Sequence, residues 1–200
     1  MNLPNKITMG RIGMAIIVLI LLVFPFYQVG VEFPTYLIAD TVKLDLRYII
    51  AGIIFIIAAA TDFLDGNIAR KRNLVTDFGK VMDAIADKIL VNGTLVALAC
   101  NGYISSIIPV VIVTRDIVVD SVKMIAGSKG NVVAASWTGK AKTTCMMIGV
   151  SLVFFSNLPF ELIGRGINVA DALLVIATIL AVISGCQYFI ANKKYFFEDK

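Results

Sequence analysis

The chain has 200 residues, of which 58% are hydrophobic and only 16% are charged, and its mean hydropathy is +0.88. Soluble domains carry about 25% charged residues, so this composition excludes an ordinary soluble domain and predicts an integral membrane protein. The net charge of +4 favours anionic lipid surfaces over nucleic acid, and the lack of histidine excludes Ser-His-Asp triads, histidine zinc sites and any imidazole base.

Six apolar stretches each come near the roughly 20 residues that an α-helix needs to cross a bilayer. They cover residues 12–29, 48–69, 78–101, 103–126, 141–158 and 168–191. Residues 1–11 contain Pro4, Lys6 and Arg11, which predict a short interfacial segment before the first span. We therefore expect an all-α integral membrane protein with six transmembrane helices and a short N-terminal interfacial segment, formed by residues 1–200 as a single domain.

Lysine and arginine are distributed unequally between the two sides of such a bundle. The connections on one side carry only Lys43, Arg47 and Arg165. The other side carries twelve such residues, namely Lys6, Arg11, Arg70, Lys71, Arg72, Lys123, Lys129, Lys140, Lys142, Lys193, Lys194 and Lys200. Because positive residues favour the cytoplasmic side, we expect a multi-pass protein of the cell membrane with both termini in the cytoplasm.

Nine charged residues fall inside the second, third and fourth apolar stretches. They are Asp62, Asp65, Asp83, Asp87, Lys88, Arg115, Asp116, Asp120 and Lys123. One charge at the bilayer centre costs about 2.5–3.5 kcal/mol on insertion scales, so nine unpaired charges would cost on the order of 25 kcal/mol. They must line a hydrated cavity, pair with each other, or hold cations. Most lie near the cytoplasmic end of their span, so the cavity is expected to open to the cytoplasm.

Acidic and small residues recur at helical spacing in the second and third spans. In the second span, Asp62, Asp65, Gly66 and Ala69 fall on one face of the helix. In the third span, Gly79, Asp83 and Asp87 follow one another at intervals of one turn. Four carboxylates in a small space require cations, and oxygen ligands without histidine or cysteine select Mg²⁺ or Mn²⁺. Two such ions could clamp phosphate oxygens. The small residues leave room for a diphosphate, and Arg70 suits a phosphate oxygen.

Other interpretations fit parts of this pattern. One aspartate pair in a membrane helix also suits a cation transporter, and Gly66 and Gly79 also suit ordinary helix packing. A transporter predicts acids near the midplane and broken helices in matched halves, whereas these acids cluster near one face and no repeat is visible. The acids of the fourth span could instead form salt bridges. These would join Asp120 to Lys123 and Asp116 to Lys88 or Arg115.

The pattern as a whole resembles the signature of the CDP-alcohol phosphotransferases at all eight positions across 26 residues. It is written Asp62-x2-Asp65-Gly66-x2-Ala69-Arg70-x8-Gly79-x3-Asp83-x3-Asp87. Further stretches resemble the bacterial phosphatidylglycerophosphate synthases within this family. They are Asn2-Leu3-Pro4-Asn5 with Thr8 and Arg11, Ala86-Asp87-Lys88, Arg115-Asp116 and Gly139-Lys140-x-Lys142-Thr143. Ala84 departs from the pattern, because these synthases usually have proline there.

The resemblance implies a six-helix membrane enzyme, usually a homodimer, with its active site near the cytoplasmic face. It would transfer a phosphatidyl group from CDP-diacylglycerol to an alcohol and release CMP. For the synthase subgroup the alcohol is sn-glycerol 3-phosphate and the product is phosphatidylglycerophosphate. Serine, inositol phosphate or phosphatidylglycerol as the acceptor is the alternative within the family.

The resemblance also assigns roles to individual residues. Two divalent cations, Mg²⁺ or Mn²⁺, would be held by Asp62, Asp65, Asp83 and Asp87. Without histidine the base is expected to be a carboxylate, and the resemblance points to Asp87, with Asp83 bridging the metals. The donor would contact Asn5, Thr8, Asp65, Gly66, Ala69, Arg70 and Gly79.

The acceptor side is predicted from charge. Its surplus of cations argues for a phosphorylated acceptor. These cations are Arg115, Lys123, Lys140 and Lys142. Simpler roles stay open for some of these residues: helix capping for Thr8, and positive charges on the cytoplasmic side for Lys140 and Lys142.

Overall fold

The computed structural model describes residues 3–38, 42–71, 77–129, 136–163 and 168–193, with the backbone alone described at 3–4, 63–71, 77–78, 80 and 163. The α-helices of this part of the chain are α1 (Leu3–Val23), α2 (Leu46–Lys71), α3 (Asp77–Cys100), α4 (Ile107–Ser128), α5 (Trp137–Phe154) and α6 (Val169–Asn192). Two 3-10 turns, η1 (Phe26–Val29) and η2 (Phe160–Ile163), lie in the connections. Each helix overlaps one of the six expected apolar stretches.

A two-stranded antiparallel sheet between α1 and α2 departs from the expected all-α fold. It consists of β1 (Thr35–Ile38) and β2 (Val42–Asp45), paired from Thr35 opposite Asp45 to Ile38 opposite Val42. Val42 and Leu44 are buried while Lys43 between them is exposed. This alternation over β-branched and apolar residues is typical of a strand with one buried face.

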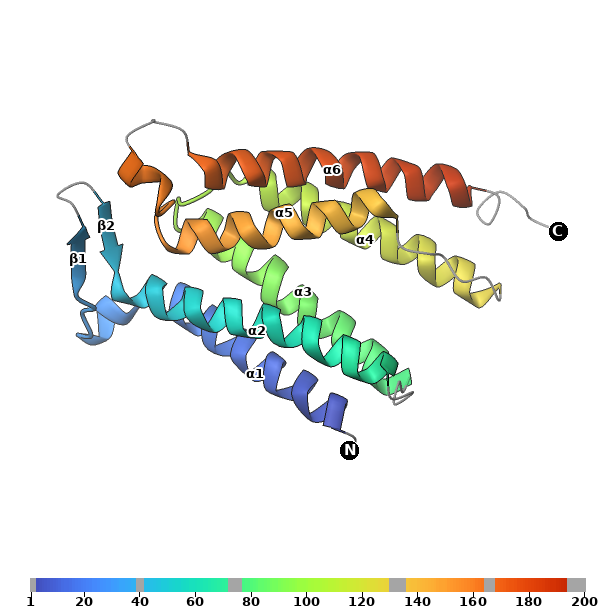
Figure 1. Ribbon diagram of the computed structural model, residues 1–200, viewed down its shortest axis with the longest axis horizontal. Coiled ribbons are helices and arrows are strands. Elements are labelled where there is room, and N and C mark those ends of the chain that lie inside the picture. The colour runs from blue at the N-terminus through green and yellow to red at the C-terminus, as the bar shows by residue number, and fades with distance from the viewer. Residues whose placement is uncertain (1–2, 39–41, 72–76, 130–135, 164–167, 194–200) are drawn as a thin grey trace.

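The six helices form two groups of three (Figure 1). In the first group α1 packs along both α2 and α3, and in the second α6 packs along both α4 and α5. Contacts of α2 with α5 and of α3 with α4 join the groups. The buried core contains residues from both, including Ala15, Phe55, Leu98, Phe154 and Leu174. Thus α1 and α6 each hold a pair of helices in place.

The crossing of α2 and α5 depends on a glycine. A Cβ atom at Gly52 would lie 2.7 Å from Cβ of Phe154, which is fixed to the α5 backbone and cannot turn away. The ring of Phe154 in turn packs against Phe55, with ring centroids 5.6 Å apart. The absence of a side chain at Gly52 therefore allows the two groups of helices to approach closely.

Gly52→Ala is expected to destabilise the fold, because the added methyl group forces α2 and α5 apart. Overpacking of this kind costs about 1–3 kcal/mol of unfolding free energy. Thermal unfolding in detergent measures the change. Gly13→Ala is the matched control, since a Cβ there meets nothing within 4 Å. An equal thermal midpoint for the two variants would contradict this account of the crossing.

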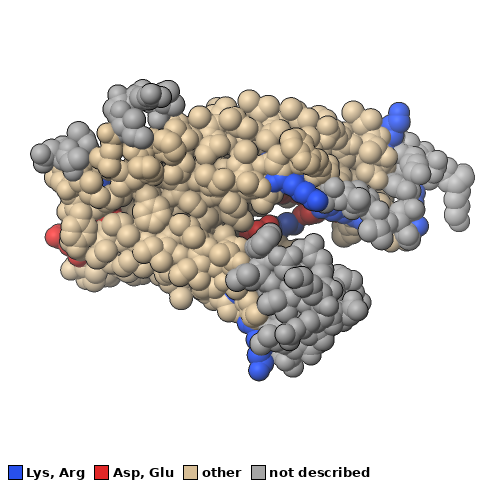
Figure 2. All heavy atoms as spheres, in the orientation of Figure 1, with Lys and Arg blue, Asp and Glu red and all other residues tan. Residues whose placement is uncertain are grey.

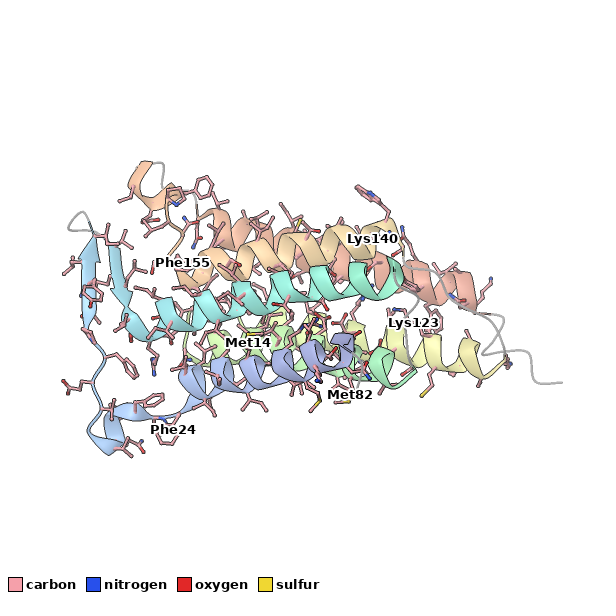
Figure 3. The ribbon with its side chains drawn as sticks, turned by 60° about the horizontal axis from the view of Figure 1, so that its bottom comes forward. Met14, Phe24, Met82, Lys123, Lys140 and Phe155 are labelled. Carbon is pink, nitrogen blue, oxygen red and sulfur yellow. The ribbon has the colours of Figure 1, made fainter. Side chains whose placement is uncertain are left out.

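The start of α1, the end of α4, the start of α5 and the end of α6 lie at one end of the molecule, and the sheet lies at the other (Figures 1 and 3). Phe24 and Phe155 mark the sheet end, and Lys123 and Lys140 mark the opposite end (Figure 3). The unequal distribution of lysine and arginine predicted that these segments share one end.

The N-terminal residues 3–11, expected to form a separate interfacial segment, are the first turns of α1 and continue without a break to Val23. Pro4 is compatible with this because a helix tolerates proline in its first turn.

In the described part of the chain, two helical segments are long and apolar enough to cross a membrane, Asn5–Val23 and Val169–Asn192.

Candidate active site

Residues of three helices meet at the first cluster of charged groups. Arg11 of α1 forms ion pairs with Asp62 of α2 and, at 3.8 Å, with Asp83 of α3. Thr8, one turn before Arg11, donates a hydrogen bond of 2.6 Å from its Oγ1 to Oδ1 of Asp83. The side chain of Arg11 is only 1% exposed, whereas Asp62 and Asp83 are 47% and 46% exposed. The two carboxylates therefore bond to α1 through Arg11 and Thr8, and about half of each aspartate side chain stays exposed.

The position of Arg11 follows from elementary electrostatics. A guanidinium this deeply buried needs carboxylate partners, because an unpaired buried charge is costly. α1 packs along both α2 and α3, so Arg11 can reach one aspartate from each helix. Asp62 and Asp83, predicted to face each other, are thus brought to the same guanidinium.

Of the residues predicted to contact the donor, the structure describes the surroundings of Asn5, Thr8 and Gly79. Thr8 lies beside Asp83, Asn5 lies one turn earlier on α1, and Gly79 is buried near the start of α3. The side chains of Asp65 and Arg70 and the surroundings of Gly66 and Ala69 lie outside the described residues, although all four positions belong to α2. The alternative role of Thr8 as a helix cap is wrong, because α1 already begins at Leu3 and the Thr8 hydroxyl bonds Asp83 of α3.

The carboxylate oxygens of this cluster are suitable ligands for a hard divalent cation. Asp62 and Asp83 offer accessible carboxylate oxygens around one shared positive charge, and Asp87 lies one turn beyond Asp83 on α3. Carboxylate oxygens are the ligands that Mg²⁺ and Mn²⁺ prefer. Among the described side chains, no three acidic or cysteine groups form a complete metal site, and Asp65 is not one of those side chains.

A cleft of about 480 Å³ lies beside this cluster, between α3, α4, α5 and α6. Its charged residues are Asp87, Lys88, Arg115, Asp116, Asp120, Lys123, Lys140 and Lys142. Figure 2 shows the hollow with basic and acidic side chains on its walls. The volume suits a small ligand, since ligand pockets span about 300–1,000 Å³. The cleft brings together the predicted base and all four cations predicted for the acceptor.

The cleft carries a surplus of positive charge. Five lysine and arginine side chains line it against three aspartates, which leaves an excess of two positive charges. Figure 3 shows Lys123 on α4 and Lys140 on α5 at the same end of the molecule. Such an excess attracts a small anion such as a phosphate monoester.

The ion pairs of Asp116 and Asp120 agree only in part with those considered from the sequence. Asp116 accepts hydrogen bonds from Arg115 at 2.9 Å and from Lys142 at 3.0 Å. The pairing of Asp116 with Arg115 confirms one of the two partners considered for it. Asp120 pairs with Lys88 of α3, and Lys123 lies over the ring of Tyr188. The expected local pair of Asp120 with Lys123 is therefore wrong, because a partner on the neighbouring helix replaces the local one.

Helix α6 contributes polar groups that sequence reasoning missed. Ser184 accepts a hydrogen bond of 2.8 Å from Nη2 of Arg115, and Tyr188 lies on the cleft wall. Ser184, Tyr188 and Asn192 are all buried and recur every four residues along α6. This buried polar stripe is the signal that distinguishes α6 from a purely apolar span.

The histidine-free carboxylates and the adjoining cationic cleft agree with the class of enzyme that the signature indicates. A family model described as CDP-alcohol phosphatidyltransferase matches residues 1–186. The chain belongs to this family.

Three relatives share the name CDP-diacylglycerol–glycerol-3-phosphate 3-phosphatidyltransferase. The protein of Bacillus subtilis (strain 168) is 38% identical over 195 residues, which covers 96% of this chain and 95% of that protein. The protein of Rickettsia bellii is 34% identical and covers 98% of this chain and 97% of its own length. The protein of Mycoplasma genitalium is 38% identical over 149 residues, covering 74% of this chain and 63% of that protein.

Proposed function

We propose that this protein transfers the phosphatidyl group of CDP-diacylglycerol to sn-glycerol 3-phosphate, producing phosphatidylglycerophosphate and CMP in phospholipid biosynthesis. The observation that carries the proposal is the cleft that brings Asp87 together with Arg115, Lys123, Lys140 and Lys142, next to Asp62 and Asp83. The names of the full-length relatives in Bacillus and Rickettsia support the same pair of substrates.

On the donor side, Asp62, Asp65, Asp83 and Asp87 would hold two divalent cations, Mg²⁺ or Mn²⁺. Such ions, when bound, would supply positive charge to the donor diphosphate and to the departing CMP. Arg11 and Thr8 hold the carboxylates of Asp62 and Asp83 in place from α1. Asn5, Gly66, Ala69, Arg70 and Gly79 would shape the space for the cytidine and the diphosphate.

On the acceptor side, the cationic wall of the cleft binds the phosphate of sn-glycerol 3-phosphate. Without these cations, the anionic acceptor and the donor diphosphate would repel each other at close range. Arg115 is suited to this role because its planar guanidinium can bind two phosphate oxygens. An uncharged acceptor such as serine would leave the surplus charge of the cleft without a partner.

The transfer itself is a displacement at phosphorus. Asp87 lines the same cleft as the cations, so an acceptor held there can place its free hydroxyl near this carboxylate. Asp87 accepts the hydroxyl proton while the hydroxyl oxygen forms a new bond to the phosphatidyl phosphorus. The bond from that phosphorus to the oxygen of CMP breaks, and CMP leaves with the bonding electrons.

The same proposal includes a place in the cell membrane. The six helices would each cross the membrane as part of a homodimer, with the cleft near the cytoplasmic face. The common end of the lysine-bearing and arginine-bearing segments supports this orientation (Figure 1). Charged residues of α2, α3 and α4 would then line the water-filled cleft and not meet lipid.

Single cysteines test this orientation in a variant whose Cys100, Cys145 and Cys186 are replaced by alanine. Two exposed positions serve as labelling sites, Tyr36 in β1 and Ser128 at the end of α4. Tyr36→Cys should react with an impermeant maleimide on intact cells, and Ser128→Cys only after permeabilisation. Reaction of both cysteines from the same side would refute the six-span arrangement.

A panel of acceptors tests the proposed reaction. Purified protein in detergent is given CDP-diacylglycerol and Mg²⁺ with sn-glycerol 3-phosphate, glycerol, serine, inositol 1-phosphate or phosphatidylglycerol, and CMP release is followed. We expect sn-glycerol 3-phosphate to give the highest kcat/KM. A higher kcat/KM with glycerol or serine would contradict the acceptor assignment and leave the phosphatidyltransferase class intact.

A further inference from the structure

Tyr188 of α6 contacts two of the predicted acceptor cations on α4 and the residue that caps α5. Its ring centroid lies 5.7 Å from Cζ of Arg115 and 5.5 Å from Nζ of Lys123, both on α4. Its hydroxyl accepts a hydrogen bond of 2.8 Å from the backbone N–H of Ser136, directly before α5 begins. The side chain is buried and forms part of the cleft wall. One aromatic residue therefore joins α4 and the start of α5 at the cleft.

The ring differs from the carboxylates of the cleft in one electrostatic respect. Asp116 holds Arg115 and Lys142 but cancels positive charge in doing so. An aromatic ring attracts a cation through its quadrupole and carries no net charge, so it can hold two cations without reducing their total charge. Tyr188 can thus keep Arg115 and Lys123 near each other while both stay available to an anion.

We propose that Tyr188 is a positioning residue for the acceptor phosphate: its ring holds Arg115 and Lys123 against their mutual repulsion, and its hydroxyl places the start of α5 beside them. This rests on the proposed function, of which it specifies the phosphate-binding part. Ser184, one turn earlier on α6, supports the same arrangement by accepting the hydrogen bond of Arg115. α6 therefore positions the acceptor cations through Ser184 and Tyr188, just as α1 positions Asp62 and Asp83 through Arg11 and Thr8.

Two aromatic variants of nearly equal shape isolate the contribution of the ring. Tyr188→Phe keeps the electron-rich ring and removes the hydroxyl, whereas pentafluorophenylalanine at the same position removes the attraction for cations at nearly the same shape. We expect the fluorinated variant to raise the KM for sn-glycerol 3-phosphate about tenfold relative to Tyr188→Phe. The KM for CDP-diacylglycerol and the kcat should stay within about twofold.

Direct binding separates this inference from the proposed reaction. The Kd for inorganic phosphate is measured by calorimetry on the purified protein, and the fluorinated variant should bind about tenfold more weakly than Tyr188→Phe. Phe189→Leu, an exposed neighbour on α6, is the control and should bind like the wild type. Equal phosphate affinity in the two aromatic variants, or no phosphate binding by the wild type, would overturn the inference. Wild type that binds phosphate but releases no CMP would overturn the proposed function alone.

Discussion

Asp83→Asn is expected to lower kcat at least about a hundredfold, because it removes a negative charge that would hold the metal ions and donor phosphates. Asp83 of α3 accepts a hydrogen bond from Thr8 and pairs with Arg11, both on α1. Asp62→Asn and Asp65→Asn should have effects of the same order. The measurement is the rate of CMP release at saturating CDP-diacylglycerol and sn-glycerol 3-phosphate.

Removing metal ions from the wild type shows whether activity depends on them, independently of any misfolding of the Asp83→Asn variant. EDTA should abolish the activity of the wild type, and Mg²⁺ or Mn²⁺ should restore it. Glu161→Gln, an exposed change in η2 at the opposite end of the molecule, should leave kcat within about twofold. Full activity in EDTA would rule out the two-metal site even if Asp83→Asn were inactive.

Arg115→Ala is expected to raise the KM for sn-glycerol 3-phosphate about tenfold to a hundredfold, since a hydrogen bond to a charged group contributes about 1.5–3 kcal/mol. The KM for CDP-diacylglycerol should change little. Arg115→Lys should recover only part of the loss, because a lysine cannot bond Asp116 and Ser184 as the guanidinium does.

The control for this prediction is Lys6→Ala, which removes an equal charge from an exposed site on α1. Steady-state kinetics with each substrate varied in turn separates the two KM values. A rise confined to the KM for CDP-diacylglycerol would place Arg115 on the donor side and invalidate the acceptor assignment.

Helical spacing places Asp83 and Asp87 one turn apart on α3. The expected approach of the second and third spans agrees with the pairing of both Asp62 and Asp83 with Arg11. Metal binding by the four aspartates stays a prediction. The contribution of Arg11 could not be found in this way. Its partners are 51 and 72 residues away in sequence, and only the packing of α1 along α2 and α3 brings them together.

Two other parts of the structure were missed for different physical reasons. The strands β1 and β2 have only four residues each, and β1 is exposed along its whole length and shows no alternation, so this segment was expected to be a loop. Ser184 and Tyr188 lie in an apolar helix where single polar groups carry little weight in a composition average. The partner of Asp120 was also missed, because Asp120 pairs with Lys88 on the neighbouring helix α3 and not with Lys123 one turn away on α4.

Isotope labelling tests the central claim most directly, namely that a hydroxyl of the acceptor attacks the phosphatidyl phosphorus. sn-Glycerol 3-phosphate labelled with ¹⁸O at the C1 hydroxyl is incubated with CDP-diacylglycerol, Mg²⁺ and the purified protein, and the products are analysed by mass spectrometry. We predict phosphatidylglycerophosphate that retains the label, together with unlabelled CMP. Phosphatidylglycerophosphate that has lost the label, or CMP accompanied by phosphatidic acid and no phosphatidylglycerophosphate, would contradict the account.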